Sequence, residues 1–514
     1  MDSRKFLTKL ILIIVFFGLC LFPLNPALAG EPLIVVSPWK ANSLDPSNSG
    51  FVFTRMGCLE TLVTSDRQGG IAPRLATAWE TSDDGLTWSF HLRPDVLFHD
   101  GTPLNAQAAS IALNHALDKG AFQGVDIEKI EAVDELVLHV KTSTPFSALP
   151  SFLAHYSGAI GAPAMYENEF NYVIGTGMYE FVSHKGLTDF EFKAFPDYWG
   201  DKARIAGARY QAISNGETRA LMAESGEAHI SLTIAPEASA RLDRHPEVEI
   251  HSAALPRVRL IKLNSSLPVF SDPDIRRAVS MSINREAIAS ALLKNPATAA
   301  TQLLPVVSAW HNHNLATPEH FQYRPEKAAQ LLEQAGWTKG RDGILIKDGQ
   351  RFSFEMITYS ARPSLPLVGQ AIQAQLKEAG IEMSIVVTES GIIPQRHSDG
   401  TLEAAFLARN FGQIPDAIAT ILADFGPSAV RGAWGAMGWE SEELYSLLDE
   451  YMNEFDFEKG RIIGWKISEI INTELPVIPV AWYDNHVAVS SRLGGFNQDP
   501  FELRPYPEGV YFKQ

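Results

Sequence analysis

Cysteine is nearly absent from this chain of 514 residues, which contains only Cys20 and Cys58. Cys20 lies in an N-terminal segment that we predict to be removed, so one thiol is left in the exported protein. A single cysteine excludes an intramolecular disulfide and provides no cysteine cluster for a structural metal. Stability must therefore come from burial of apolar side chains. The sequence does not reveal whether Cys58 itself is buried.

Long apolar runs are also missing, except for one near the N-terminus. Three basic residues precede the thirteen-residue run Leu10 to Phe22, and Ala27-Leu28-Ala29 follows it. The run is shorter than the roughly 20 residues that cross a bilayer as a helix, and small residues at 27 and 29 suit signal peptidase. We predict a signal peptide over residues 1–29 and export to the periplasm. The alternatives are an uncleaved anchor and a lipid-modified Cys20.

Basic residues are outnumbered, with 43 Lys and Arg against 60 Asp and Glu and a formal net charge of −17. Such a chain offers no basic footprint for a polyphosphate, so we predict no nucleic-acid partner. The sequence also lacks the phosphate-loop, dinucleotide-binding, nucleophile-elbow and His-Glu-x-x-His motifs. We therefore predict no catalytic residues, no cofactor and no enzymatic activity. A secreted hydrolase is the alternative from another class, and it would require a catalytic triad in a cleft.

Hydrophobic residues make up 46% of the chain and charged residues 20%, which is typical of globular proteins. The apolar pattern switches repeatedly between the period of a strand and the period of a helix, as in mixed α/β proteins. At about 150 residues per domain, the length suggests roughly three structural units. The clearest predicted strands are Leu33 to Val36, Thr87 to Leu92 and Glu135 to Val140, and the clearest predicted helices are Ala106 to Leu117, Asp274 to Leu293 and Pro325 to Ala335.

Several short blocks occur in a fixed order along the chain. They are Pro73-Arg74-Leu75-Ala76, Phe98-His99-Asp100-Gly101-Thr102-Pro103, Gly175-Thr176-Gly177, Asp197-Tyr198-Trp199-Gly200 and Asp274-Ile275-Arg276-Arg277-Ala278. Together they resemble, over residues 31–512, the peptide/nickel family of extracytoplasmic solute-binding proteins of ABC importers. Each block also has a local interpretation: Asp100-Gly101 is a turn dipeptide, and His99 beside it is expected to be structural.

The resemblance implies an α/β bilobed periplasmic-binding-protein fold of the large type, with an additional inserted domain. We expect a discontinuous domain I over residues 30–60, 170–255 and 487–514, an inserted domain II over residues 61–169, and a domain III over residues 256–486. The chain would cross between lobes near Pro256 and His486. A monomer would close on a ligand in the interlobe cleft by a hinge and then dock on an ABC permease.

The segment Arg409 to Asp416 resembles the family's cleft segment and is the most informative about the ligand. Peptide-binding relatives place an aspartate three residues after the aromatic, where it pairs with the peptide ammonium; here that position is Ile414. An ammonium taken into a partly dry cleft without a carboxylate would lose several kcal/mol of compensation. Peptide binding is therefore weakened, and Gly412, directly after Phe411, looks more like the nickel branch.

The nickel branch is not matched completely either. Its histidine would fall at Ala429, and the arginines that it uses to hold a chelate would fall near Tyr156 and Ala159. Arginine suits this task because its planar fork grips a carboxylate bidentately. Arg409 and Arg431 are the candidates to replace the missing arginines, and Tyr156 is a candidate ligand contact.

Some nickel relatives bind the metal through histidines on the late strand that crosses between the lobes. His486, in Trp482-Tyr483-Asp484-Asn485-His486, is therefore our candidate metal ligand, since neutral imidazole suits Ni²⁺; alternatively it only caps the strand. Phe411, Trp39, Trp482 and Tyr483 are candidates for the cleft wall and equally for the core. The pair His311 and His313 falls in a predicted surface loop, and its role stays open.

These observations favour a periplasmic solute-binding protein that captures nickel or a nickel chelate for an ABC importer. A di- or oligopeptide is the runner-up within the same transport class. The secreted hydrolase belongs to another class, as does a signalling or chaperone-like receptor on the same scaffold, which the sequence does not distinguish from transport.

Overall fold

A computed structural model describes residues 30–66, 69–122, 125–427 and 431–514. The predicted signal peptide, with Cys20, and the position of Ala429 lie outside these ranges. Within them, no helix is both long and apolar enough to cross a membrane. Cys58 is completely buried.

A ten-stranded mixed sheet forms the body of the molecule and confirms the α/β prediction. Its middle strands, β12 and β19, are the longest and pair with each other antiparallel. Strands β17, β16 and β18 extend the sheet on one side, and β11, β1, β10, β9 and β8 extend it on the other. In sheet order the strands are β17 (Glu382–Thr388), β16 (Ser353–Tyr359), β18 (Ala404–Asn410), β12 (Val248–Leu263), β19 (Val477–Ser490), β11 (Ile230–Ser231), β1 (Leu33–Ser37), β10 (Gly207–Ala212), β9 (Asp189–Ala194) and β8 (Tyr179–Lys185).

A β-bulge interrupts the pairing of the two long strands between Leu255 and Val258. Pro256 lies in this bulge, which suits a residue without a backbone N–H, because proline cannot donate a ladder hydrogen bond. A bulge bends its strand and re-aims neighbouring side chains. The irregularity lies where the sequence predicts a crossing between lobes, although the predicted division into three domains stays a prediction.

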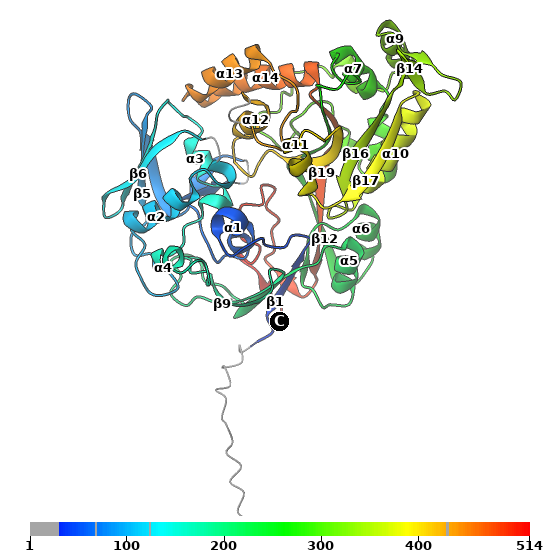
Figure 1. Cartoon of the computed structure of the whole chain (residues 1–514). Helices are drawn as coiled ribbons and strands as arrows, with labels where there is room; N and C mark the ends of the chain where they lie inside the picture. The colour runs from blue at the N-terminus through cyan, green and yellow to red at the C-terminus, as the bar shows by residue number, and fades with distance from the viewer. Residues whose placement is uncertain (1–29, 67–68, 123–124, 428–430) are drawn as a thin grey trace, which may run out of the picture.

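A separate four-stranded antiparallel sheet lies at the left of Figure 1, covered by α2. Strand β5 has the predicted bounds, and its residues alternate between buried and half-buried, as a strand with one face on a core should. The order is β4 (Ala76–Thr81), β5 (Thr87–Leu92), β7 (Val137–Thr142) and β6 (Ile127–Asp134); the smaller sheets are β2 (Val63–Ser65) with β3 (Ile71–Pro73), β13 (Thr338–Lys339) with β14 (Leu345–Lys347) and β15 (Gln350–Arg351), and β20 (Leu493–Gly494) with β21 (Tyr511–Phe512).

Fourteen α-helical segments are found among the described residues. They are α1 (Pro46–Arg55), α2 (Ala106–Ala116), α3 (Leu149–Phe152), α4 (Pro163–Glu167), α5 (Gly216–Glu224), α6 (Pro236–Leu242), α7 (Pro273–Met281), α8 (Arg285–Ala287), α9 (Pro325–Gln334), α10 (Ser364–Glu378), α11 (Ile392–Ser398), α12 (Ala417–Phe425), α13 (Glu442–Met452) and α14 (Phe457–Glu474).

The predicted helix Pro325 to Ala335 is confirmed as α9, with Pro325 in its first turn. The single helix predicted over Asp274 to Leu293 is wrong, because α7 ends at Met281 and a new helical segment begins at Arg285. Asn284 causes this restart, since its side chain accepts a hydrogen bond from the backbone N–H of Ala287 as an N-cap.

Three of the ordered sequence blocks meet at one buried carboxylate, Glu60. Its oxygens pair with Arg74 at 2.7 Å and accept hydrogen bonds from Thr176, Tyr198 and Trp199 at 2.8–3.0 Å. His99 links its own block to the Gly175-Thr176-Gly177 block, since its ring bonds to the N–H of Gly175 and the carbonyl of Gly177. Burial lowers the pKa of His99 to about 4, so the ring is neutral. These blocks therefore serve the scaffold, as expected for His99.

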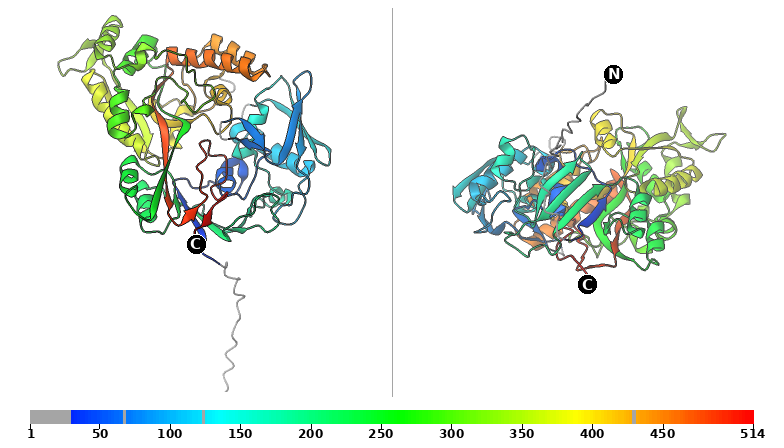
Figure 2. Two further views of the ribbon diagram at one scale, coloured as in Figure 1. Left: turned by 180° about the vertical axis from the view of Figure 1, so that it is seen from behind. Right: turned by 90° about the horizontal axis from the view of Figure 1, so that it is seen from below.

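The C-terminal segment, red in Figures 1 and 2, rises from the base of the molecule into its middle. It places residues 498–506 between α1 on one side and the β12 bulge on the other, because Tyr506 bonds to Arg55 and Glu502 bonds to Arg257. The part of the chain before the β12 bulge (residues 30–255) and the part after it (residues 258–486) are called the two halves below. They also touch directly, where the N–H of Ser147 donates to the carbonyl of Met452 at 2.9 Å.

Candidate functional site

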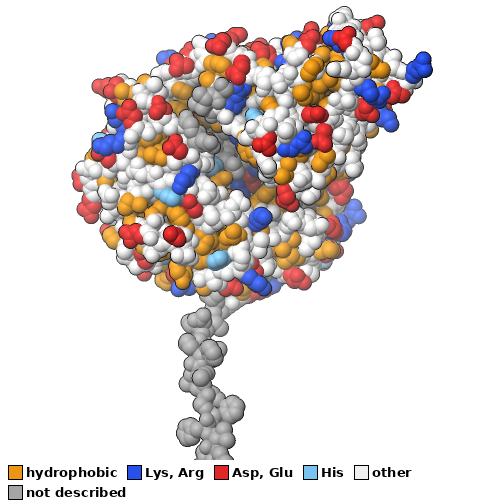
Figure 3. Space-filling model, in the orientation of Figure 1, with side chains coloured by type: hydrophobic (Ala, Val, Ile, Leu, Met, Phe, Trp, Pro, Cys, Tyr) orange, Lys and Arg blue, Asp and Glu red, His pale blue; other side chains and the backbone are white. Residues whose placement is uncertain are grey.

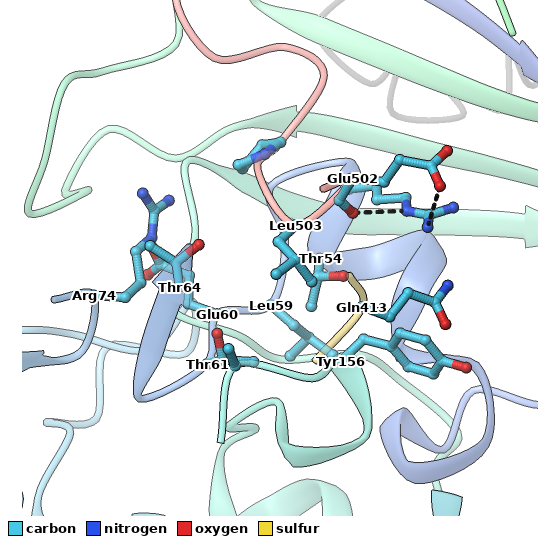
Figure 4. Close-up of a pocket in the computed structure, with 13 residues that line it drawn as sticks. Thr54, Leu59, Glu60, Thr61, Thr64, Arg74, Tyr156, Gln413, Glu502 and Leu503 are labelled. Carbon is cyan, nitrogen blue, oxygen red and sulfur yellow. Dashed lines mark hydrogen bonds and ion pairs between the residues drawn. The ribbon is translucent and has the colours of Figure 1, made fainter. Parts of the chain in front are cut away.

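A pocket opens where four stretches that are far apart in the sequence meet. The space within its walls that water can enter is only about 20 Å³, and about 470 Å³ when the open solvent at its mouth is included. Figure 3 shows the surface hollowed near the middle of the molecule, and Figure 4 shows the lining side chains. The walls come from α1 and the segment after it, from residues 154–156, from Gln413 and from the C-terminal segment; they are Thr54, Arg55, Leu59, Glu60, Thr61, Thr64, Arg74, Ala154, Tyr156, Gln413, Glu502, Leu503 and Pro505.

Glu502 is the carboxylate that the C-terminal segment carries into this pocket. It forms ion pairs with Arg257 and, at 3.8 Å, with Arg55, whose Nε also donates to the Glu502 carbonyl at 3.2 Å. The backbone of Glu502 has φ +58°, in the left-handed region, where a residue other than glycine needs support from its surroundings. Burial raises the pKa of Glu502, but Arg257, Arg55 and Arg362 lower it to about 2, so the side chain is ionised.

Three arginines surround the ring of Tyr483 beside Glu502. The guanidinium carbons of Arg259, Arg362 and Arg257 lie 4.0, 5.1 and 5.3 Å from the ring centre. Arg362 also lies over the ring of Trp39, at 4.8 Å. The β12 bulge explains how Arg257 and Arg259 both reach this ring, since Tyr483 pairs with Leu255 directly before the irregularity.

The charge of these arginines acts on the phenol of Tyr483. Burial alone raises the pKa of Tyr483, but Arg362, Arg259 and Arg257 outweigh it and hold the pKa below the usual value of 10. A buried tyrosine with a lowered pKa indicates an environment of strongly positive potential. The region where the halves meet is therefore cationic, whereas the whole chain is acidic.

Of the predicted ligand contacts, Tyr156 lines the pocket, and Trp39 and Tyr483 belong to the arginine cluster. Arg409 makes a bidentate ion pair with Asp424, at 2.5 and 2.8 Å. It lies close enough to Tyr156 to act on its pKa: burial raises that pKa, and Arg55 and Arg409 lower it in part. The structure thus brings four of the predicted residues to the junction of the two halves.

The side chains of the other predicted contacts are engaged within the protein. Phe411 and Trp482 are buried in the hydrophobic core, where the indole N–H of Trp482 donates to the carbonyl of Gln302. Arg431 pairs with Glu440 and donates to the carbonyl of Trp439. Their role toward a ligand stays a prediction.

His486 lies on β19 three residues after Tyr483, with regular pairing between them. Because side chains alternate along a strand, the two side chains point to opposite faces of the sheet. The Nδ1 atom of His486 bonds to the hydroxyl of Ser252 at 2.7 Å, and the side chain is half-buried. Its predicted role as a metal ligand remains a prediction. Within the described ranges, no three His, Cys, Asp or Glu side chains are grouped to hold a metal ion.

The loop with His311 and His313, predicted to lie at the surface, is partly buried. His311 is buried against Trp482, with ring centres 5.5 Å apart, and its Nδ1 bonds to the carbonyl of Leu304. His313 is exposed, and its ring lies 4.6 Å from that of His311. The loop is anchored through His311 because the large Trp482 ring offers it an apolar surface.

The cleft segment places Ile414, where peptide-binding relatives would have an aspartate, almost completely out of contact with solvent. The acid two residues later, Asp416, is the N-cap of α12 and accepts a hydrogen bond from Tyr451 at 2.9 Å. Burial raises the pKa of Asp416 to about 6. The carboxylate of Asp416 is thus already hydrogen-bonded within the protein and does not replace the missing carboxylate at position 414.

Sequence reasoning missed Arg55, Glu502, Arg257, Arg259 and Arg362. One signal was available: Arg257 and Arg259 interrupt the otherwise apolar stretch Ala253 to Ile261 of β12, and charged residues are rarely buried without a partner. No local pattern marks Glu502, since it lies in an irregular segment near the end of the chain.

A profile described as "Bacterial extracellular solute-binding proteins, family 5 Middle" matches residues 70–430. The glutathione-binding protein GsiB of Escherichia coli K12 is 28% identical over 379 residues, 71% of each chain. Among solved structures, NikA of Staphylococcus aureus in complex with Ni(L-His)2 superposes with a TM-score of 0.82 at 20% identity, covering 94% of this chain and 100% of that one. The oligopeptide-binding protein AppA of Bacillus subtilis, with a nonapeptide, gives 0.81 at 20% identity, covering 94% and 99%.

Proposed function

The chain belongs to family 5 of the bacterial extracellular solute-binding proteins, and we propose that it delivers a small solute, such as a nickel chelate, from the periplasm to an ABC permease. The family and the matched relatives are binding proteins rather than enzymes, and the bilobed fold is theirs. Export through the signal peptide at residues 1–29 and action as a monomer are part of the proposal.

The observation that carries the proposal is the composition of the pocket. Thr54 and Leu59 come from one half, Gln413 comes from the other, and Glu502 comes from the C-terminal segment between them. A pocket built in this way is complete only when the halves are close together. Closure is then favoured by any solute that makes more contacts in the closed state than in the open state.

We propose a chelate rather than a free metal ion as the nickel species. A chelator brings most of the donor atoms that Ni²⁺ needs, while its carboxylates suit the guanidinium groups at the junction of the halves. His486 stays a proposed metal ligand, and because it faces away from Tyr483 and the arginines it would hold a metal at a separate position. The second candidate is an acidic peptide, which is favoured by the similarity to glutathione-binding GsiB.

Titration calorimetry with Ni²⁺-citrate, Ni²⁺-histidine, glutathione and a neutral tripeptide tests the cargo. We expect a chelate or glutathione to bind and the neutral tripeptide to bind weakly, since Ile414 offers no partner for its ammonium. Small-angle scattering tests closure, and the radius of gyration should fall when the bound solute saturates the protein. An unchanged profile at saturation would contradict the importer mechanism, and tight binding of the neutral tripeptide would contradict the cargo.

A further inference from the structure

The junction of the two halves holds more positive than negative charge. Arg55, Arg257, Arg259 and Arg362 are all buried there, with at most 7% of each residue exposed. In the described part of the chain, two carboxylates raise the pKa values of these arginines. Glu502 acts on Arg55, Arg257 and Arg362, and Asp484 acts on Arg259. Four guanidinium groups thus share two carboxylates, and two positive charges are left over. A buried charge is costly unless it is paired.

The arginines differ in how well the protein satisfies them. Arg259 donates from Nε to the hydroxyl of Ser364 and from Nη1 to the carbonyl of Trp482, at 3.1 and 2.6 Å. In contrast, Nε and Nη1 of Arg257 and Nε of Arg362 are buried without an acceptor among the described residues. The guanidinium N–H groups without an acceptor therefore belong to Arg257 and Arg362.

The electrostatic balance at Arg257 agrees with this assignment. Burial lowers the pKa of the Arg257 guanidinium, and the neighbouring Arg362 lowers it further. Glu502 opposes both effects only in part, so the pKa stays below its usual value. The pKa of Arg362 is raised instead, because its burial is outweighed by Tyr483, Tyr359 and Glu502. The single carboxylate at this point thus leaves Arg257 incompletely compensated.

The surroundings fix these two guanidinium groups in place. Arg362 lies against Trp39 and Tyr483, and Arg257 faces the Tyr483 ring. Stacking on an aromatic ring leaves the N–H groups at the edge of the guanidinium plane available, which is the geometry of bidentate carboxylate binding. Glu502 shows that a carboxylate fits beside these groups, since its Oε2 contacts Nη2 of both Arg257 and Arg55.

Neutral polar groups border the cluster as well. Asn485 lies on the same strand face as Tyr483, and its Oδ1 has no donor among the described residues. The same holds for Oε1 of Gln498, whose Nε2 donates to the carbonyl of Asn485. These two acceptors can receive N–H or O–H groups from the uncharged part of a solute.

We propose that the solute carries at least two acidic groups, which bind Arg257 and Arg362, so that the cargo is a small dicarboxylate or a similar dianion. This inference rests on the proposed function, because it assumes that a solute enters between the halves. It narrows the cargo to compounds whose charge balances the two arginines.

The first test needs no solute. If the four arginines together carry more charge than Glu502 and Asp484 compensate, Arg362→Gln should raise the urea midpoint of the ligand-free protein, since it removes one buried cation from the cluster. The matched control is Arg259→Gln in the same cluster, which should lower the midpoint because its hydrogen bonds to Ser364 and Trp482 are lost. If Arg362→Gln lowers the midpoint as much as Arg259→Gln, the arginines are already compensated and the proposal is wrong.

The second test is a thermal-shift series at constant ionic strength. The probes are succinate, citrate and glutathione, each compared with an analogue that lacks its acids, such as succinamide and glutathione diethyl ester, and with the mono-acid succinamate. Compounds that stabilise the protein should carry two or more acidic groups, and Arg362→Gln should weaken their binding at least tenfold. If a neutral or mono-acidic probe stabilises the protein as strongly, the charge requirement is refuted, although the importer function is not. Failure of that function shows separately, as a scattering profile that does not change at saturation.

Discussion

Replacing Glu502 by glutamine tests the electrostatics of the cleft most directly. Glutamine has nearly the same shape as glutamate but no charge, so Arg55 and Arg257 would lose their common carboxylate. The pKa of Glu502 falls from its usual 4.5 to about 2 in the folded protein, because the decrease caused by the arginines exceeds the increase caused by burial. A difference of roughly 2.5 pKa units corresponds to about 3 kcal/mol of stabilisation of the folded state.

The sign of the pH dependence follows from the lowered pKa. The stabilisation by Glu502 is complete above pH 4.5 and is lost as the pH falls toward 2, where the folded protein also binds the proton. We therefore expect Glu502→Gln to reduce the free energy of unfolding at pH 7 by about 3 kcal/mol. The difference between the variant and the unmodified protein should shrink as the pH is lowered from 4.5 toward 2.

Urea unfolding followed by tryptophan fluorescence, at pH 7 and at several values below 4.5, measures both effects. Glu440→Gln is the control, because Glu440 pairs with Arg431 at the surface and its side chain is 57% exposed. Exposed ion pairs of this kind contribute about 0–1 kcal/mol. The reasoning is refuted if Glu502→Gln and Glu440→Gln have the same stability at pH 7.

Two further variants test other parts of the description. Phe455 lies against Trp88, with ring centres 6.1 Å apart, and next to Gly85, and both of these residues belong to the opposite half. Phe455→Ala should therefore increase the radius of gyration of the ligand-free protein in small-angle scattering. An unchanged radius would show that this contact does not hold the halves together. His486→Ala should weaken binding of Ni²⁺-histidine in calorimetry while leaving the melting temperature nearly unchanged, and equal affinity would remove His486 from the site.

The local elements of the fold were largely predictable from the sequence. Strand β5 and helix α9 follow from a periodicity carried by their own residues, and the turns at Gly85 and Gly101 follow from the freedom of glycine to adopt positive φ. The helix predicted from Asp274 failed because a capping side chain inside an apolar pattern can end one helix and begin the next. Periodicity alone does not distinguish these cases.

The candidate site was less accessible, because it is formed by residues from distant segments. Arg55 and Glu502 are separated by more than four hundred positions, and only the folded chain brings them together. Tyr156 was noted because a family arginine is missing there, and Trp39 and Tyr483 were noted as aromatics. Arg362 lies directly after a strand and before a helix, where ligand-binding residues of α/β folds are common, yet no motif marks it.

The acidic surface and the cationic interior of this protein act at different ranges. At physiological ionic strength, charges more than about 8 Å away through solvent are largely screened, so the net charge of −17 repels an approaching anion only weakly. In the open state, water also screens the exposed guanidinium groups. Their attraction for a carboxylate becomes strong only when closure excludes that water. A solute with two acids would therefore gain most of its binding energy in the closed state, and this difference between the states would drive the proposed closure.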